Sequence, residues 1–153
     1  MAQQQKSGPG SRSVRDVMTT NPDCVSGNDS IFDAARIMRD SDTGVVPVVD
    51  GKKIVGLITD RDIVVRAIAD GKDLKTVRVS EIMTRQVKSV KEDTSVNDVF
   101  KLMSSSEIRR VPVVNASDEI VGIVSIGDLA SRTSQDDQVG QAVEQISQAP
   151  PNN

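Results

Sequence analysis

The chain has 153 residues, 37% of them hydrophobic, and a formal net charge of -3 at pH 7, which suits one ordinary domain or two very small ones. It has no Trp, no Tyr, two Phe and no basic block, so it lacks the stacking platforms and the positive charge of nucleic-acid binders, and we expect no nucleic-acid partner. It also has no His, the commonest general base and metal ligand, and its one cysteine, Cys24, excludes an intramolecular disulfide and favours a reducing compartment.

The first stretch of the chain, residues 1–12, is rich in Gln, Ser, Gly and Pro and is predicted to be a disordered tail. It has no apolar segment of the secretory type, and no apolar run in the chain approaches the ~20 residues that span a bilayer. We therefore expect a soluble, cytoplasmic protein with no membrane segment. The apolar spacing within residues 14–19 then predicts one or two helical turns, which Asn21 and Pro22 end.

Two longer helices are predicted in the first half of the chain. Ser30 is a good N-cap for a helix whose apolar positions share one face, and residues 43–44, Thr and Gly, are expected to close it. A second helix is expected to begin at Thr59 and to end at residues 70–71, Asp and Gly.

A hairpin is predicted between these helices. Residues 45–49 and 53–59 are apolar, and the Asp-Gly turn signal at residues 50–51 separates them. Pro47 lies inside the first run, which argues for an edge position or for an extended, partly unpaired strand.

An internal repeat is the strongest feature of the sequence. A shift of 65 places residues 17–49 on residues 82–114, with eleven identities among 33 positions. One extra residue in the second hairpin turn changes the shift to 66, so that Asp62 lies on Asp128. A single insertion in a predicted turn is what a structural duplication tolerates.

The repeat divides the chain into four parts: a tail at 1–12, repeat 1 at 13–73, repeat 2 at 78–132, and residues 133–153. A unit of about 60 residues is marginal alone, so we expect the two copies to pack by pseudo-two-fold symmetry. The last part is predicted to be a short helix followed by a loose end, because apolar residues at helical spacing form a narrow stripe: Val139, Ala142, Val143 and Ile146.

These residues resemble a known family. The ordered set M-T, a helix, V-P-V-V, a turn, I-V-G-L-I-T-D-R-D and a closing helix looks like a CBS domain, and two copies over residues 14 to about 132 look like a tandem CBS pair, or Bateman module. The short stand-alone pairs of bacteria and archaea, including the mycobacterial hypoxic response type, look most similar. The resemblance implies an α+β fold of two βαββα repeats that pair through their sheets, and modules that form homodimers.

The resemblance also implies adenosine-type ligands, such as AMP, ADP, ATP or S-adenosylmethionine, in clefts between the paired repeats. The family pattern G-h-x-[ST]-x-x-[ND] occurs at residues 56–62 and 122–128. Its acid, Asp62 or Asp128, would bind the ribose hydroxyls, and its hydroxyl residue would lie near the phosphate. A carboxylate can accept from both ribose hydroxyls, and N–H groups at a helix start suit a phosphate, so the chemistry agrees. The hydroxyl residues are Thr59 and Ser125.

The V-P-V-V strands and the residues before them complete the candidate site. An aliphatic wall suits a purine face, and a half-open strand can present its backbone to the purine edge. The strand candidates are Val45, Val46, Pro47, Val111 and Pro112. Basic residues that precede this motif in the family contact phosphate; Arg109 and Arg110 precede the second copy, where the first has Gly44 and Val45. The two clefts should therefore differ, and the sequence leaves open which one the arginines reach.

Each assignment has a plainer alternative. Residues 30–33 and 95–98 show the same hydroxyl-to-acid spacing where we expect only helix caps, so the two candidate pairs can also be caps. Arg109 and Arg110 can be a surface pair, and the glycine in each second strand can mark an approach either to the other repeat or to a ligand. Cys24 suits a small half-buried position better than a redox role. Core packing is the default for four methionines that recur at equivalent places: Met18, Met38, Met83 and Met103.

Three functions are compatible with the sequence to different degrees. A regulatory module that binds an adenine nucleotide or another adenosyl ligand agrees best with the repeat and the pattern. A ligand-free dimer that docks a partner protein is the alternative, and it would leave both candidate pairs as caps. An enzyme is not expected, because the chain lacks His, a metal-ligand cluster, a P-loop and an activated nucleophile. No catalytic cofactor is expected either.

Overall fold

The computed structural model describes residues 12–132. The predicted N-terminal tail, apart from its last residue, and the predicted C-terminal helix and end lie outside these residues. The elements in chain order are the 3-10 turn η2 (Val14–Asp16), strands β1 (Thr19–Thr20) and β2 (Val25–Ser26), helix α1 (Ile31–Ser41), strands β3 (Val45–Asp50) and β4 (Lys53–Thr59), helix α2 (Asp60–Ile63) with its π-helical continuation η3 (Val64–Ile68), helix α3 (Val79–Ile82), strand β5 (Val90–Lys91), helix α4 (Val96–Ser106), strands β6 (Arg110–Val114) and β7 (Ile120–Ser125), and helix α5 (Ile126–Arg132). No helix within residues 12–132 is long and apolar enough to cross a membrane.

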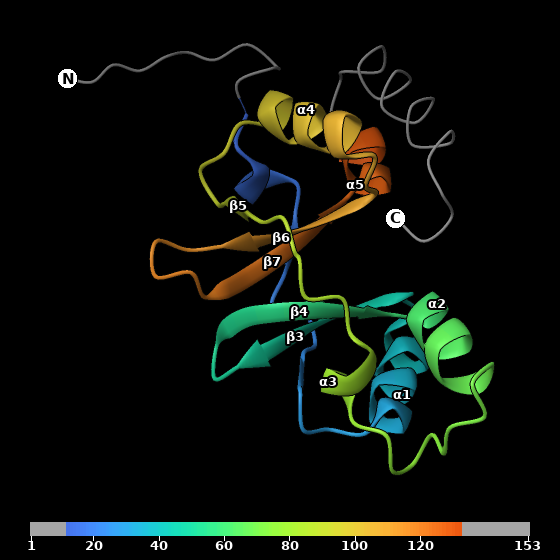
Figure 1. The fold of residues 1–153 in the computed structure, drawn as a ribbon. Helices are drawn as coiled ribbons and strands as arrows, with labels where there is room; N and C mark the ends of the chain where they lie inside the picture. The colour runs from blue at the N-terminus through green and yellow to red at the C-terminus, as the bar shows by residue number, and fades with distance from the viewer. Residues whose placement is uncertain (1–11, 133–153) are drawn as a thin grey trace.

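Each half of the molecule has a small sheet with helices packed on it. One sheet has the strand order β2-β3-β4 and the other β1-β7-β6-β5. Figure 1 shows the two hairpins next to each other in the middle, with α1 and α2 beyond one sheet and α4 and α5 beyond the other. Strand, helix, two strands and helix recur in both halves, so the predicted α+β fold of two βαββα repeats is confirmed.

Both hairpins have the predicted form. β3 and β4 pair antiparallel down to Asp50 opposite Lys53, and Gly51 between them has φ 65°. β6 and β7 pair in the same way, and their turn is one residue longer, which places the inserted residue where it was expected. Both hairpins shift register at the equivalent place, between Val48 and Val49 in the first.

The proline in each V-P-V-V strand lies where the strand has a neighbour on one side only. β4 pairs with the whole of β3, whereas β2 pairs only with Val48 and Val49, beyond Pro47. The second sheet repeats this, because β5 pairs with β6 only from Val113 onward. The prediction of an extended, partly unpaired strand is therefore confirmed, while the alternative of an edge strand is wrong for the second half of β3, which is central.

The helix starts agree with the sequence, and one helix end does not. The Ser30 hydroxyl accepts the N–H of Asp33 at 3.1 Å, and Ser95 caps α4 in the same way. α1 ends at Ser41, and its C-cap is Asp42, which has φ 51° and donates its N–H to the Met38 carbonyl. The predicted closure at residues 43–44 was therefore slightly late, because an aspartate adopts the left-handed conformation that glycine usually supplies.

The helix after β4 starts as predicted but changes type. Thr59 is its N-cap, and the π-helical continuation begins at Val64, whose carbonyl accepts the N–H of Ala69 at 2.9 Å. Gly71, at φ 73°, follows close after it and agrees with the predicted end. A π-turn leaves no periodic signal of its own in so short a segment.

The opening segment of each repeat packs into the core of the other half. The hydrophobic cluster around α4, β6 and β7 includes Val14, Val17 and Met18, whereas the cluster around α1, β3 and β4 includes Ile82 and Met83. β1 pairs with β7, and the N–H and carbonyl groups of Leu57 and Thr84 exchange hydrogen bonds of 2.9 and 2.8 Å. Each hydrophobic core therefore contains residues from both sequence repeats. The chain crosses from one half of the molecule to the other twice. The four recurring methionines are all buried, as core packing requires.

A glycine in the second strand of each hairpin makes room for these crossing segments. A Cβ on Gly56 would lie 2.8 Å from the Thr84 carbonyl oxygen, and a Cβ on Gly122 would lie 2.5 Å from the sulfur of Met18 and 3.0 Å from the Thr19 carbonyl oxygen. Of the two alternatives for these glycines, the structure therefore shows the close approach to the other repeat.

Candidate functional site

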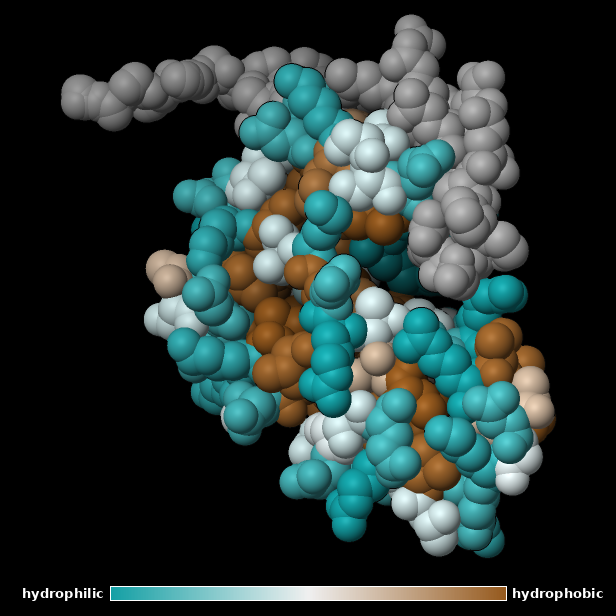
Figure 2. All heavy atoms as spheres, viewed as in Figure 1, coloured by the Kyte–Doolittle hydropathy of each residue, from teal (hydrophilic) through white to brown (hydrophobic). Residues whose placement is uncertain are grey.

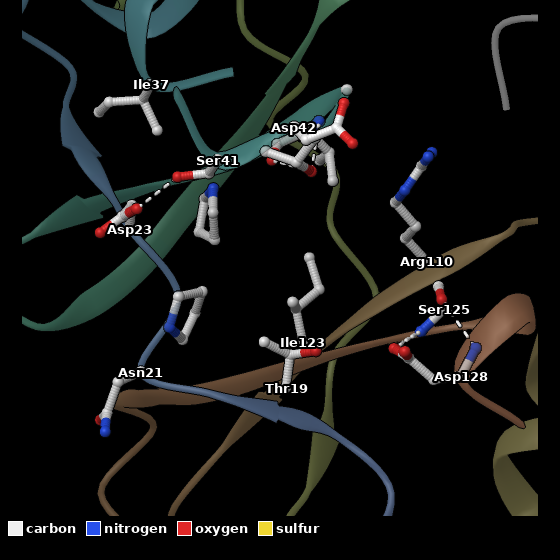
Figure 3. A pocket seen from close by; sticks show the side chains of 15 residues that line it. Thr19, Asn21, Asp23, Ile37, Ser41, Asp42, Arg110, Ile123, Ser125 and Asp128 are labelled. Carbon is white, nitrogen blue, oxygen red and sulfur yellow. Dashed lines mark hydrogen bonds between the residues drawn. The ribbon is translucent and has the colours of Figure 1, made fainter. Parts of the chain in front are cut away.

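A cleft of about 460 Å³ opens between the two halves of the molecule. Four places line it: β1 with the segment that follows it, the second half of α1 with its following turn, the first half of β3, and residues of β6, β7 and α5 that face them. Figure 3 shows the side chains converging on this space from both sheets. Both repeats and the first crossing segment are needed to form it, in agreement with a cleft between paired repeats.

Ser125 and Asp128 stand on the floor of this cleft, at the junction of β7 and α5. The Ser125 N–H donates to Oδ2 of Asp128 at 2.9 Å, and the Asp128 N–H donates to the Ser125 hydroxyl oxygen at 3.0 Å (Figure 3). The pair is a reciprocal helix cap, as the plainer alternative predicted. Oδ1 of Asp128 accepts no hydrogen bond from another described residue, so a half-buried carboxylate with one unused oxygen lines the cleft.

Thr59 and Asp62 form the same reciprocal cap in the first repeat, with both hydrogen bonds at 3.0 Å. Neither residue lines this cleft. Asp62 is only 8% exposed, and its Oδ1 lies 3.8 Å from Nε of Arg66. The two pairs are therefore equivalent as caps, while the second oxygen of Asp62 lies near a cation and Asp128 lines the cleft.

The V-P-V-V residues divide between the cleft and the cores. Val45 and Pro47 line the cleft. Val46 and Val111 are fully buried in the two hydrophobic clusters, and Pro112 is buried without lining the cleft. Strand alternation explains the division within β3, because successive side chains point to opposite faces.

One of the two arginines reaches the cleft. Arg110 lies opposite Ser125 in the β6–β7 register, is exposed, and lines the cleft above the capping pair (Figure 3). Arg109 is also exposed but does not line it, and its carbonyl accepts the N–H of Ile126 at 2.9 Å. Arg110 thus lines the cleft that holds the acid of its own repeat.

Several lining residues were not predicted from the sequence. The Ser41 hydroxyl donates to Oδ2 of Asp23 at 2.7 Å and ties the end of α1 to the crossing segment. Asp42, beside Ser41, adds a second carboxylate to this wall. The available signal was the repeat itself, since Ser41 and Thr19 are identical to their counterparts in the second copy although neither lies in a strand motif.

Cys24 lies beside this wall in a half-buried position, as expected. Burial, and then the nearby charge of Asp23, raise the pKa of the Cys24 thiol above its ordinary value, and the thiol donates to the Pro22 carbonyl at 3.3 Å. A protonated thiol is a weak nucleophile, which agrees with a structural role. Within residues 12–132, no group of three or more His, Cys, Asp or Glu side chains is placed to hold a metal ion.

Comparison with known proteins agrees with this arrangement. The family model of the CBS domain matches residues 14–68 and 79–135. The chain is 40% identical to CBS domain-containing protein YhcV of Bacillus subtilis over 135 residues, 88% of this chain and 95% of that protein. It is 33% identical to hypoxic response protein 1 of Mycobacterium tuberculosis over 118 residues, 76% and 82% of the two chains.

A solved structure adds ligands to the comparison. The CBS domain pair of protein MJ0100, in complex with 5′-methylthioadenosine and S-adenosyl-L-methionine, is similar with a TM-score of 0.70 and 36% identity, over 78% of this chain and 94% of that one.

Proposed function

Because the chain belongs to the CBS domain family, as a tandem pair of repeats, we propose that it is a regulatory module that binds an adenosyl ligand in the cleft lined by Ser125 and Asp128. The observation that carries the proposal is the Asp128 carboxylate. One of its oxygens is fixed by the Ser125 N–H, and the other is left for the cleft. A carboxylate held in this way can accept hydrogen bonds from two vicinal ribose hydroxyls, because each oxygen has two lone pairs.

The rest of the cleft suits the other parts of such a ligand. Val45, Pro47 and Ile123 offer an aliphatic surface for the purine, and the first half of β3 has backbone that no strand covers on the β2 side. With the ribose on Asp128, the neighbouring Ser125 and Arg110 would contact its 5′ substituent. A volume of about 460 Å³ is within the usual range of roughly 300–1,000 Å³ for small-molecule sites.

The ligand class has support from a relative. The CBS pair of MJ0100 binds 5′-methylthioadenosine and S-adenosylmethionine, both of which carry an adenosyl group. AMP, ADP and ATP share that group and belong to the same proposed class. We place this role in the cytoplasm, where such ligands are made and where a lone thiol stays reduced.

Thermal unfolding of the purified chain tests the proposal. A ligand at about 100 times its dissociation constant should stabilise the fold by roughly 2.7 kcal/mol and raise the melting temperature. We expect a rise with at least one of 5′-methylthioadenosine, S-adenosylmethionine, AMP, ADP and ATP, and no rise with matched cytidine compounds. If none of the adenosyl compounds moves the transition at millimolar concentration, the proposal is wrong.

We also propose that the chain forms a homodimer through η3. Val64, Val65 and Ile68 are 53%, 45% and 51% exposed, which is unusual for three aliphatic residues in one short helix. Figure 2 shows apolar atoms gathered at this edge of the molecule. A second copy of the chain would cover the same residues on both partners in a two-fold dimer.

The mass in solution tests the dimer. Sedimentation equilibrium should give about twice 16.4 kDa for the wild-type chain, and Val64→Lys with Ile68→Lys should return the value to that of a monomer. Val55→Lys, at a 38% exposed position on β4, is the matched control and should leave the dimer intact. A monomeric wild-type chain at micromolar concentration would contradict the proposal.

A second candidate is a ligand-free module that docks a partner protein. It is favoured by one observation: both hydroxyl-acid pairs make complete helix caps, so capping alone can account for them. Recovery of a stable partner by the purified chain, without any thermal response to adenosyl compounds, would favour it over the first. Neither candidate includes catalysis, since the sequence offers no His and no activated nucleophile.

A further inference from the structure

The lining of the cleft is acidic. Asp23, Asp42 and Asp128 contribute carboxylates, and Arg110 is the only basic residue among the lining residues. Carboxylate and guanidinium groups carry opposite charges when ionised, and the lining has three of the first and one of the second. A cleft lined mostly by one sign of charge repels ligand groups of that sign.

Two of these carboxylates belong to residues at defined places in the fold. The Ser41 hydroxyl donates to Oδ2 of Asp23 at 2.7 Å, and the backbone of Asp42 has the left-handed C-cap conformation at the end of α1. Figure 3 shows Asp42 on the opposite side of the cleft from Ser125 and Asp128. A further acid stands behind this wall, because Oδ2 of Asp60 lies 2.9 Å from the position of a Cβ on Gly44, which is itself a lining residue.

Arg110 can balance one negative charge but not several. Within residues 12–132 it makes no ion pair, so its exposed guanidinium is available to a single phosphate. A second and a third phosphate would extend along a space whose other charged groups are carboxylates, and each would add repulsion without adding a partner.

We propose that this cleft selects adenosyl ligands whose 5′ substituent carries at most one phosphate, that affinity falls with the second and the third phosphate, and that Asp42 is a specificity-determining residue. The inference rests on the proposed function and narrows its ligand class. A neutral thioether at the 5′ position meets no like charge in the cleft and a single phosphate can pair with Arg110, whereas a triphosphate meets three carboxylates.

Isothermal titration calorimetry without divalent cations tests the order. We expect 5′-methylthioadenosine and AMP to bind more tightly than ADP, and ADP more tightly than ATP, with about a 10-fold or larger difference between AMP and ATP at low salt. Raising the salt concentration should narrow that difference, because mobile ions screen exposed charges.

A pair of variants locates the cause. Asp42→Asn removes one charge and keeps the backbone, since asparagine accepts φ 51° as readily as aspartate does. It should raise the affinity for ATP several-fold and leave that for 5′-methylthioadenosine almost unchanged. Asp118→Asn is the matched control: it removes the same charge at φ 62°, but Asp118 pairs with Lys91 at 2.6 Å and does not line the cleft.

The outcomes separate the two proposals. Equal or tighter binding of ATP, or equal effects of the Asp42 and Asp118 variants, would overturn the charge selection while leaving adenosyl binding in place. Absence of binding by every compound would overturn both. A falling series that Asp42→Asn flattens and Asp118→Asn preserves supports the selection.

Discussion

Replacing Asp128 with alanine should lower the affinity for 5′-methylthioadenosine by on the order of 100-fold, because two charge-assisted hydrogen bonds to the ribose are lost. The same change removes one of the two hydrogen bonds of the helix cap, the one from the Ser125 N–H, which contributes about 1 kcal/mol to stability. Asp128→Asn separates the two effects, because its amide oxygen can still accept the Ser125 N–H while the charge is gone. Calorimetric titration should show a large loss of affinity in both variants. Thermal unfolding should show the smaller loss of stability in the asparagine variant.

Asp62→Ala is the matched control for this prediction. It removes the equivalent hydrogen bond, which the Thr59 N–H donates to Oδ2 of Asp62 at 3.0 Å, but Asp62 does not line the cleft that holds Asp128. It should lower stability by a similar or larger amount, since Arg66 also loses its ion pair with Asp62, and leave this cleft able to bind. Equal loss of affinity in the Asp62 and Asp128 variants would mean that binding is lost because the fold is destabilised, and not because a contact with Asp128 is removed.

Replacing Gly122 with alanine should destabilise the fold by about 1–3 kcal/mol, the usual cost of overpacking a core. The new methyl group would lie 2.5 Å from the sulfur of Met18 and 3.0 Å from the Thr19 carbonyl oxygen. The methionine side chain can rotate away, but the carbonyl belongs to β1, which pairs with β7 at this position. Chemical denaturation should show a lower midpoint with an unchanged slope.

Gly127→Ala is the control for the glycine prediction. Its Cβ would meet only the Ser125 hydroxyl oxygen, at 3.6 Å, and it lies in helix α5, where alanine is preferred over glycine by up to about 1 kcal/mol. Its stability should therefore be equal to or above that of the wild type. A Gly122 variant as stable as the Gly127 variant would show that the crossing segment does not pack closely enough on β7 to exclude a methyl group.

Much of the fold could be predicted from the sequence because its signals are local. The Asp-Gly turn before Lys52, the hydroxyl caps at Ser30 and Ser95, and the proline in each V-P-V-V run act within a few residues of themselves. Because the sequence repeats, the caps and the proline each occur in both copies, and the alignment of the two copies places the single insertion in a turn. The capping pair at Ser125 and Asp128 was found for the same reason, since its spacing is a short-range pattern.

The exchange of opening segments could not be predicted in this way. Both repeats open with Met-Thr, at Met18 and Met83, so the segments suit either half equally well by composition. Which core each one enters depends on the path of the chain in space. The glycines opposite them indicated a close approach, and only the structure identified the backbone that approaches.

The acidic wall of the cleft was missed for a related reason. Asp23 follows a crossing segment and Asp42 ends a helix, so neither belongs to the strand-turn-strand motif that carries the family pattern. They come together only because α1 and the crossing segment meet, through Ser41 and Asp23, at the cleft. Side chains from distant parts of the chain have no characteristic sequence spacing, so the sequence alone does not predict that they meet.

A crystal structure of the chain grown with 5′-methylthioadenosine tests adenosyl binding at Asp128 most directly. We predict one molecule in the cleft, with its ribose hydroxyls within hydrogen-bond distance of the Asp128 carboxylate and its purine against Val45 and Pro47. A ligand bound elsewhere, or a cleft that contains only water at saturating ligand, would contradict the central claim.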